Sequence, residues 1–162
     1  MKHAGIIAAL LLAAAPGAAI AKDAKVADAD YSFEHVSCNG AENEIRVIVT
    51  GVRDNVGLVT ADLFPNREEG FLRKRGRILQ VKFAAKAPMT KFCLTAPEPG
   101  LFAVSIYHDE NANGDFDKNA LGLPAEHWGL SNNPKVRFGP PPVEATVFEV
   151  TAEGARVHIK LN

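Results

Sequence analysis

The chain has 162 residues, 47% of them hydrophobic, and its formal net charge is −1 at pH 7. A chain of this length forms one domain with a sizeable core. Its near-neutral charge argues against binding to nucleic acid or to an anionic membrane, so no nucleic-acid partner is expected.

Residues 1–21 are predicted to form a secretory signal peptide. They have a short basic start, an apolar run over 4–15 and a small-residue cleavage site at 19–21. The apolar run is shorter than the roughly 20 residues that a retained membrane helix needs. We therefore expect an exported chain, periplasmic or secreted, that does not span a membrane after cleavage. Residues 22–30 are small and charged, which predicts a flexible leader.

Residues 31–162 are predicted to form one all-β domain. Apolar and polar residues alternate with a period of two, and glycine, proline and asparagine turns separate the runs. About seven strands in this pattern favour an antiparallel β-sandwich with one long polar loop. The expected strands are residues 44–50, 58–64, 77–84, 90–94, 101–108, 146–150 and 156–161, preceded by a candidate short first strand at 31–38.

Two cysteines, Cys38 and Cys93, lie in the part that would be exported. An even pair in an oxidising compartment is most simply a disulfide. Two free thiols are the alternative, and they offer too few ligands for a thiolate metal site.

The long polar loop, residues 108–133, concentrates oxygen-bearing side chains as no other segment does. Residues 109–117 have the D-x-N-x-N-G-x-x-D spacing of a calcium loop, in which glycine permits a sharp bend and alternate side chains point inward. Oxygen ligands without sulfur favour calcium as the cofactor. The expected ligands are Asp109, Asn111, Asn113, Asp115, Asp117, Asn119 and Glu126.

The calcium loop departs from an EF-hand in two ways. Ala120 stands where the bidentate glutamate should be, so Asn119 or Glu126 would supply the last oxygen. A strand precedes the loop, and Gly122 and Pro124 follow it in place of a second helix. The alternative is a plain loop of asparagine and aspartate turns that needs no ion.

A second set of loop residues is predicted to contact a small-molecule, carbohydrate or protein ligand. Trp128 offers an aromatic surface, while the other members offer hydrogen-bonding groups. The set comprises His108, Trp128, Ser131, Asn132 and Asn133. The structural interpretation is that His108 and Trp128 pack at the rim of the core, and that the Ser-Asn-Asn run caps the loop.

Catalysis is not expected. Ser131 lacks the G-x-S-x-G elbow, and no order of nucleophile, base and orienting residue is present. A hydrolase using His108 and the loop carboxylates is the weakest of the functional alternatives.

These motifs resemble a secreted bacterial family of unassigned function, domain-of-unknown-function family 2141. The resemblance rests on HDxNxNGxxDxN over residues 108–119 and on GxPxExxGFSNN over 122–133, where Leu130 replaces the phenylalanine. Val143 also stands where an aromatic residue often follows the prolines. The resemblance implies a prealbumin-like sandwich, also described as transthyretin-like or Cna-B-like. It implies calcium only by analogy.

Two functions follow as hypotheses. The first is an exported binding module whose calcium-type loop presents Trp128 and its polar neighbours to a ligand. The alternative is an envelope structural protein in which the loop only stabilises the fold.

Overall fold

A computed structural model describes residues 38–137 and 139–162 of the chain. The predicted signal peptide and leader lie outside the described residues. So do residues 31–37 of the expected first strand, and Cys38 itself is not in a strand.

The described residues form eight strands and two short 3-10 turns, and they contain no α-helix. Each predicted strand from residue 44 onward is confirmed to within about two residues at either end. The sequence did not predict β6, which lies inside the segment that was expected to be irregular. The strands are β1 Glu44–Thr50, β2 Leu58–Pro65, β3 Leu79–Ala84, β4 Met89–Thr95, β5 Gly100–Asp109, β6 His127–Leu130, β7 Phe148–Val150 and β8 Ala155–Lys160.

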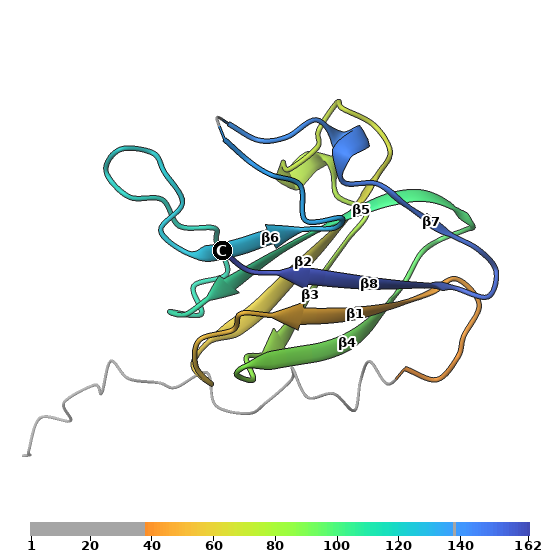
Figure 1. Ribbon diagram of the computed structural model, residues 1–162, viewed down its shortest axis with the longest axis horizontal. Coiled ribbons are helices and arrows are strands. Elements are labelled where there is room, and N and C mark those ends of the chain that lie inside the picture. The colour runs from red at the N-terminus through yellow and green to blue at the C-terminus, as the bar shows by residue number, and fades with distance from the viewer. Residues whose placement is uncertain (1–37, 138) are drawn as a thin grey trace, which may run out of the picture.

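The strands make two sheets, as the sandwich prediction requires (Figure 1). One sheet has the order β4-β1-β8, and the other has the order β3-β2-β5-β6, with β7 also pairing with β5. All strand pairs are antiparallel except β1 with β8, which run parallel. β5 pairs with three strands and is therefore the central support for the loop that follows it.

The core lies between the two sheets. Alternate residues of β1, such as Ile45, Val47 and Val49, are buried at 0–1% exposure, as the period-two pattern predicts. The rings of Phe83 in one sheet and Phe92 in the other stack with centroids 4.2 Å apart. Such contacts hold the two sheets together.

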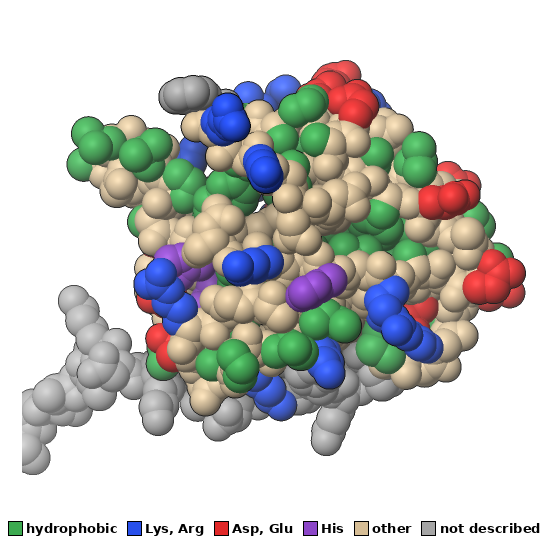
Figure 2. All heavy atoms as spheres, viewed as in Figure 1, with side chains coloured by type: hydrophobic (Ala, Val, Ile, Leu, Met, Phe, Trp, Pro, Cys, Tyr) green, Lys and Arg blue, Asp and Glu red, His purple; other side chains and the backbone are tan. Residues whose placement is uncertain are grey.

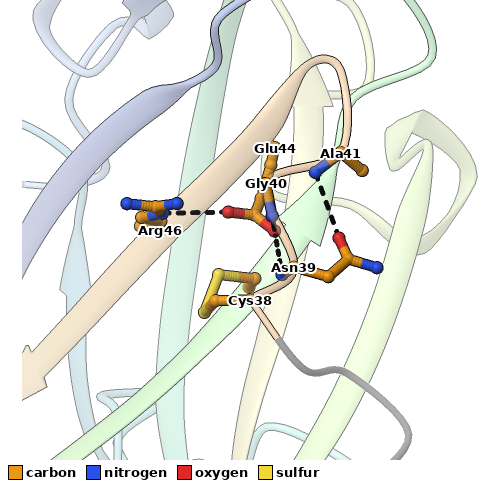
Figure 3. Close-up of a disulfide and its surroundings, with 7 residues drawn as sticks. Cys38, Asn39, Gly40, Ala41, Glu44 and Arg46 are labelled. Carbon is orange, nitrogen blue, oxygen red and sulfur yellow. Dashed lines mark hydrogen bonds and ion pairs between the residues drawn. A yellow bond between two sulfur atoms is a disulfide. The ribbon is translucent and has the colours of Figure 1, made fainter.

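The predicted disulfide between Cys38 and Cys93 is confirmed, with the two Cα atoms 5.3 Å apart. Figure 3 shows how the chain after Cys38 folds over the start of β1. The buried Glu44 carboxylate accepts N–H bonds from Asn39 and Gly40, at 2.8 and 3.0 Å, and pairs with Arg46 at 2.9 Å. The hydrogen bond from Arg46 lowers the pKa of Glu44. A disulfide is typical of an oxidising compartment.

No helix among the described residues has the length and apolar character needed to cross a membrane.

Candidate functional site

The segment between β5 and β6 projects from one end of the sandwich (Figure 1) and starts from Asp109, the last residue of β5. Asp109 is fully buried. Its carboxylate accepts the backbone N–H groups of Asn113 at 3.1 Å and Gly114 at 2.8 Å. Gly114 has a φ of +83°, which glycine adopts at little cost. Asp109 thus bends the chain back over the end of its own strand.

Two asparagine turns continue the winding. The side-chain oxygen of Asn111 accepts the N–H of Asn113 at 3.0 Å, and that of Asn113 accepts the N–H of Asp115 at 2.8 Å. Both amide groups also donate to the same Oδ2 atom of Asp117, at 2.8 and 3.0 Å. The amide groups of two predicted ligands, Asn111 and Asn113, therefore converge on one carboxylate oxygen of a third, Asp117.

Glu126, just before β6, closes the loop from the opposite side. Its Oε2 accepts the backbone N–H of Asp117 at 3.1 Å, whereas its Oε1 is buried without a hydrogen-bond partner. Burial, together with the smaller effect of the nearby carboxylates of Asp109, Asp117 and Glu110, raises the pKa of Glu126 to about 7. The result is a group of carboxylates that repel one another beside a buried oxygen.

The other two predicted calcium ligands have different contacts. The Asp115 carboxylate forms an exposed ion pair with Lys74, and the hydrogen bond from Lys74 lowers the pKa of Asp115. The Asn119 side-chain oxygen accepts the N–H groups of Leu121 and Leu123, at 2.9 and 3.1 Å. Both side chains therefore shape the outer part of the loop.

Tight groups of metal-binding side chains are rare in the described parts of the chain. There, the one set of three His, Cys, Asp or Glu ligand atoms lying mutually within 4.8 Å belongs to Cys38, Glu44 and Cys93. The disulfide makes those two sulfurs poor ligands. An ion in the 109–126 loop would consequently need amide or backbone oxygens in addition to carboxylates.

We expect Glu126→Gln to remove a pH-dependent loss of stability. Because the folded-state pKa of Glu126, about 7, exceeds its ordinary value of 4.5, the fold favours the protonated form. Stability from this group is greatest below pH 4.5 and falls as pH rises through about 7. Above that pH, after discounting for solvent screening, the variant should be more stable than the wild type by about 1 kcal/mol.

Urea unfolding of both proteins between about pH 5 and 8 measures this difference. The exposed Glu98→Gln variant controls for loss of one charge. If the difference in unfolding free energy between Glu126→Gln and the wild type does not grow with pH, the surroundings do not destabilise the ionised carboxylate of Glu126.

The predicted ligand-binding residues His108 and Trp128 lie on opposite faces of the sheet. His108 is fully buried on the core face, and its Nε2 bonds to the carbonyl oxygen of Val56 at 2.8 Å. Trp128 lies beside Tyr107 on the other face and is half-buried. It lines an open cavity of about 360 Å³ with eight further residues: Gly129, Leu130, Asn133, Pro134, Val136, Lys160, Leu161 and Asn162.

Ser131 and Asn132 bond to backbone in the described structure. The Ser131 hydroxyl accepts the N–H of Val104 at 2.9 Å and donates to the carbonyl of Thr146 at 2.5 Å. Asn132 donates to the carbonyl of Val147 at 2.6 Å. These bonds fasten the chain after β6 to β5 and to the turn before β7.

Asn133 connects the two sheets. Its amide donates to the carbonyl of His158 at 2.8 Å and its oxygen accepts the N–H of Lys160 at 2.7 Å. Both partners belong to β8, an edge strand of the three-stranded sheet. Asn133 thus covers part of a sheet edge that would otherwise expose unpaired backbone groups.

Tyr107 is a site residue that the sequence did not single out. Its hydroxyl donates to the carbonyl of Gly114 at 3.3 Å, and its ring packs on Phe116 with centroids 5.4 Å apart. Burial raises the pKa of Tyr107 to about 12, helped by carboxylates that include Asp109. The sequence could have indicated Tyr107 through its position, since it lies one residue before His108 and on the same face of the strand as Asp109.

One family model matches the chain, over residues 47–158. No curated protein and no solved structure matches it, so the prealbumin-like assignment stays a prediction. The matched region begins within β1 and extends into β8, and it includes both polar motifs that first indicated the family. The chain belongs to the family described as an uncharacterized protein conserved in bacteria, DUF2141.

Proposed function

We propose that the chain is an exported β-sandwich binding module whose 109–126 loop takes up calcium. The observation that carries the proposal is the buried Oε1 atom of Glu126, which has no hydrogen-bond partner and lies near three other carboxylates. A cation would give Oε1 the partner that it lacks, and it would reduce the repulsion between Glu126 and the other carboxylates. The signal-like start of the sequence and the disulfide support export to the periplasm or beyond.

The loop contacts are compatible with calcium. Calcium takes six to eight oxygens, and Asp109, Asn111, Asn113, Asp117 and Glu126 would supply side-chain oxygens, with backbone carbonyls completing the set. Asp109 already winds the chain into a tight turn through two backbone bonds. The ion would replace the Asn111 and Asn113 amide groups as the partner of Asp117 Oδ2. Little reorganisation of the backbone is then needed.

Calcium should raise the melting temperature of the wild type. A weak extracellular-type site has a Kd near 10⁻³ M, so about 10 mM calcium would stabilise the fold by roughly 1.4 kcal/mol. For a domain of this size that corresponds to about 5 °C. Thermal melting with calcium, and with magnesium as the comparison ion, measures the shift.

Two variants locate the effect. Asp117→Asn keeps the size of the side chain and should abolish the calcium shift, whereas Asp115→Asn, on the outer part of the loop, should largely retain it. A wild-type midpoint that stays constant at millimolar calcium would reject the ion and leave a plain hydrogen-bonded loop.

The alternative is an envelope structural protein whose loop only stabilises the fold. The contacts of Ser131, Asn132 and Asn133 support it, because their side chains bond to backbone of neighbouring elements. A ligand screen followed by Trp128 fluorescence separates the two functions. A ligand that quenches the wild type and fails to bind Trp128→Ala supports the binding module, and the absence of any quenching ligand favours the structural protein.

A further inference from the structure

A narrow hairpin within the long polar loop exposes two leucines. Lys118 and Pro124 pair as an antiparallel bridge, and the residues between them form the tip. Leu121 is 82% exposed and Leu123 is 58% exposed. The hairpin projects from the body of the sandwich in Figure 1, and Figure 2 shows hydrophobic side chains gathered on the projecting part. Contiguous exposed apolar groups mark a contact with a partner or a membrane.

The backbone of the tip is hydrogen-bonded within the hairpin itself. The side-chain oxygen of Asn119 accepts the N–H groups of Leu121 and Leu123, at 2.9 and 3.1 Å. The backbone oxygen of Asn119 accepts the N–H of Gly122, and its own N–H donates to the carbonyl of Leu123, both at 2.9 Å. Pro124 has no N–H to satisfy. Backbone donors that are already paired are the condition for leaving water and entering a bilayer.

The composition of the tip favours lipid over a protein partner. Residues 119–125 have the sequence NALGLPA and carry no charged side chain. The centres of protein–protein contacts are enriched in Trp, Tyr and Arg, and leucine is under-represented there. The oxygen of Asn119, the polar side chain of the tip, accepts bonds from the hairpin's own backbone. A convex aliphatic tip of this kind offers little for directional recognition and suits the interfacial region of a bilayer.

Other exposed side chains at this end of the sandwich would assist such a contact. Phe116 in the same loop is 37% exposed. Val56 is 59% exposed in the turn before β2, whose first residue, Leu58, pairs with Asp109 at the base of the loop. Lys118 is exposed at the base of the hairpin, where its apolar stem lets the ammonium group reach lipid phosphates. The exposed apolar groups are therefore not confined to the tip.

We propose that this end of the sandwich docks on a bilayer of anionic phospholipid, with Leu121 and Leu123 inserted into the interfacial region. The docking rests on the proposed calcium function, because the carboxylates of Asp109, Asp117 and Glu126 at the base of the hairpin would repel lipid phosphates. Calcium in the loop cancels part of that charge and can also bind phosphate oxygens. The net charge of −1 gives no attraction by itself. Binding should consequently need both calcium and the leucines.

The test is co-sedimentation with vesicles of equal parts of phosphatidylcholine and phosphatidylglycerol, at about 10 mM calcium, well above the Kd of a weak extracellular-type site. We expect the wild type to bind and a chelator to release it. Leu121→Ser and Leu123→Ser should each weaken binding about tenfold, and the double variant about a hundredfold, because each removes an inserted apolar side chain.

Leu101→Ser is the matched control. Leu101 is 47% exposed, and it lies near the start of β5, at the opposite end of that strand from Asp109. The variant loses an exposed leucine as the hairpin variants do, and it should bind the vesicles as the wild type does.

Thermal melting of the same proteins separates the docking from the calcium function. Calcium should raise the melting temperature of the Leu121→Ser, Leu123→Ser double variant as it does that of the wild type, because leucine is not a calcium ligand. A calcium shift without vesicle binding, or vesicle binding that the double variant retains, would overturn the docking alone. If calcium leaves the melting temperature unchanged, the calcium function fails, and leucine-dependent vesicle binding would then show that the hairpin docks without the ion.

Discussion

Replacing Asp109 with alanine is expected to lower the free energy of unfolding by about 2 kcal/mol. Two backbone N–H groups, those of Asn113 and Gly114, lose their acceptor. Leaving them unsatisfied costs about 3 kcal/mol in total. Removing the charge also relieves repulsion with Glu126, which offsets about 1 kcal/mol. Desolvation of the backbone is the larger effect, so the net change is a loss, measured by urea unfolding at neutral pH.

The matched control is Asp115→Ala in the same loop. Asp115 is exposed and its carboxylate pairs with Lys74, so its removal should change stability by less than about 0.5 kcal/mol. The loss of unfolding free energy for Asp109→Asn should lie between those of the two alanine variants. The single amide oxygen of asparagine can accept only some of the N–H bonds that the two carboxylate oxygens accept. Equal losses for Asp109→Ala and Asp115→Ala would contradict the organising role of Asp109.

The strands were largely predictable because their signal is local. In β1 and β5, successive side chains point alternately to the core and to the opposite face of the sheet, which is partly exposed to solvent and partly covered by other elements. The period-two pattern carries that information without reference to other strands. β6 was missed because only four residues form it and Gly129 interrupts its pattern. A Cβ atom at Gly129 would lie 2.6 Å from the backbone oxygen of Lys160 in β8. Packing between the sheets, which is not local, therefore specifies this strand.

The same distinction between local signals and packing between distant residues applies to the loop. The turns at Asn111 and Asn113 depend on residues two positions apart, so spacing alone predicts them. The approach of Glu126 to Asp117 and the bond from Tyr107 to Gly114 depend on how β6 and β5 pair. The sequence proposed Glu126 as one of two candidates for the last oxygen ligand. It did not indicate that the Ser131–Asn133 side chains would tie β6 to β5 and β8.

The pairing of Cys38 with Cys93 was predictable from the number of cysteines and the predicted export alone. Its consequence for stability also follows from the sequence, because the chain-entropy estimate depends on loop length. The structure adds that Cys93 is buried in β4 while Cys38 is exposed just before the segment that Glu44 holds. The cross-link therefore holds the start of the described chain against the three-stranded sheet.

Reducing the disulfide is expected to lower the free energy of unfolding by about 4 kcal/mol, the largest effect foreseen for this chain. The cysteines are 55 residues apart, and the cross-link restricts the unfolded chain over that length. Urea unfolding of the wild type with and without reductant measures the difference. A Cys38→Ala, Cys93→Ala double variant should resemble the reduced wild type, with a further loss of about 1 kcal/mol for the space left by the buried Cys93 side chain. Reductant should leave the double variant unchanged. A reduced wild type as stable as the oxidised one would show that the fold does not depend on the cross-link.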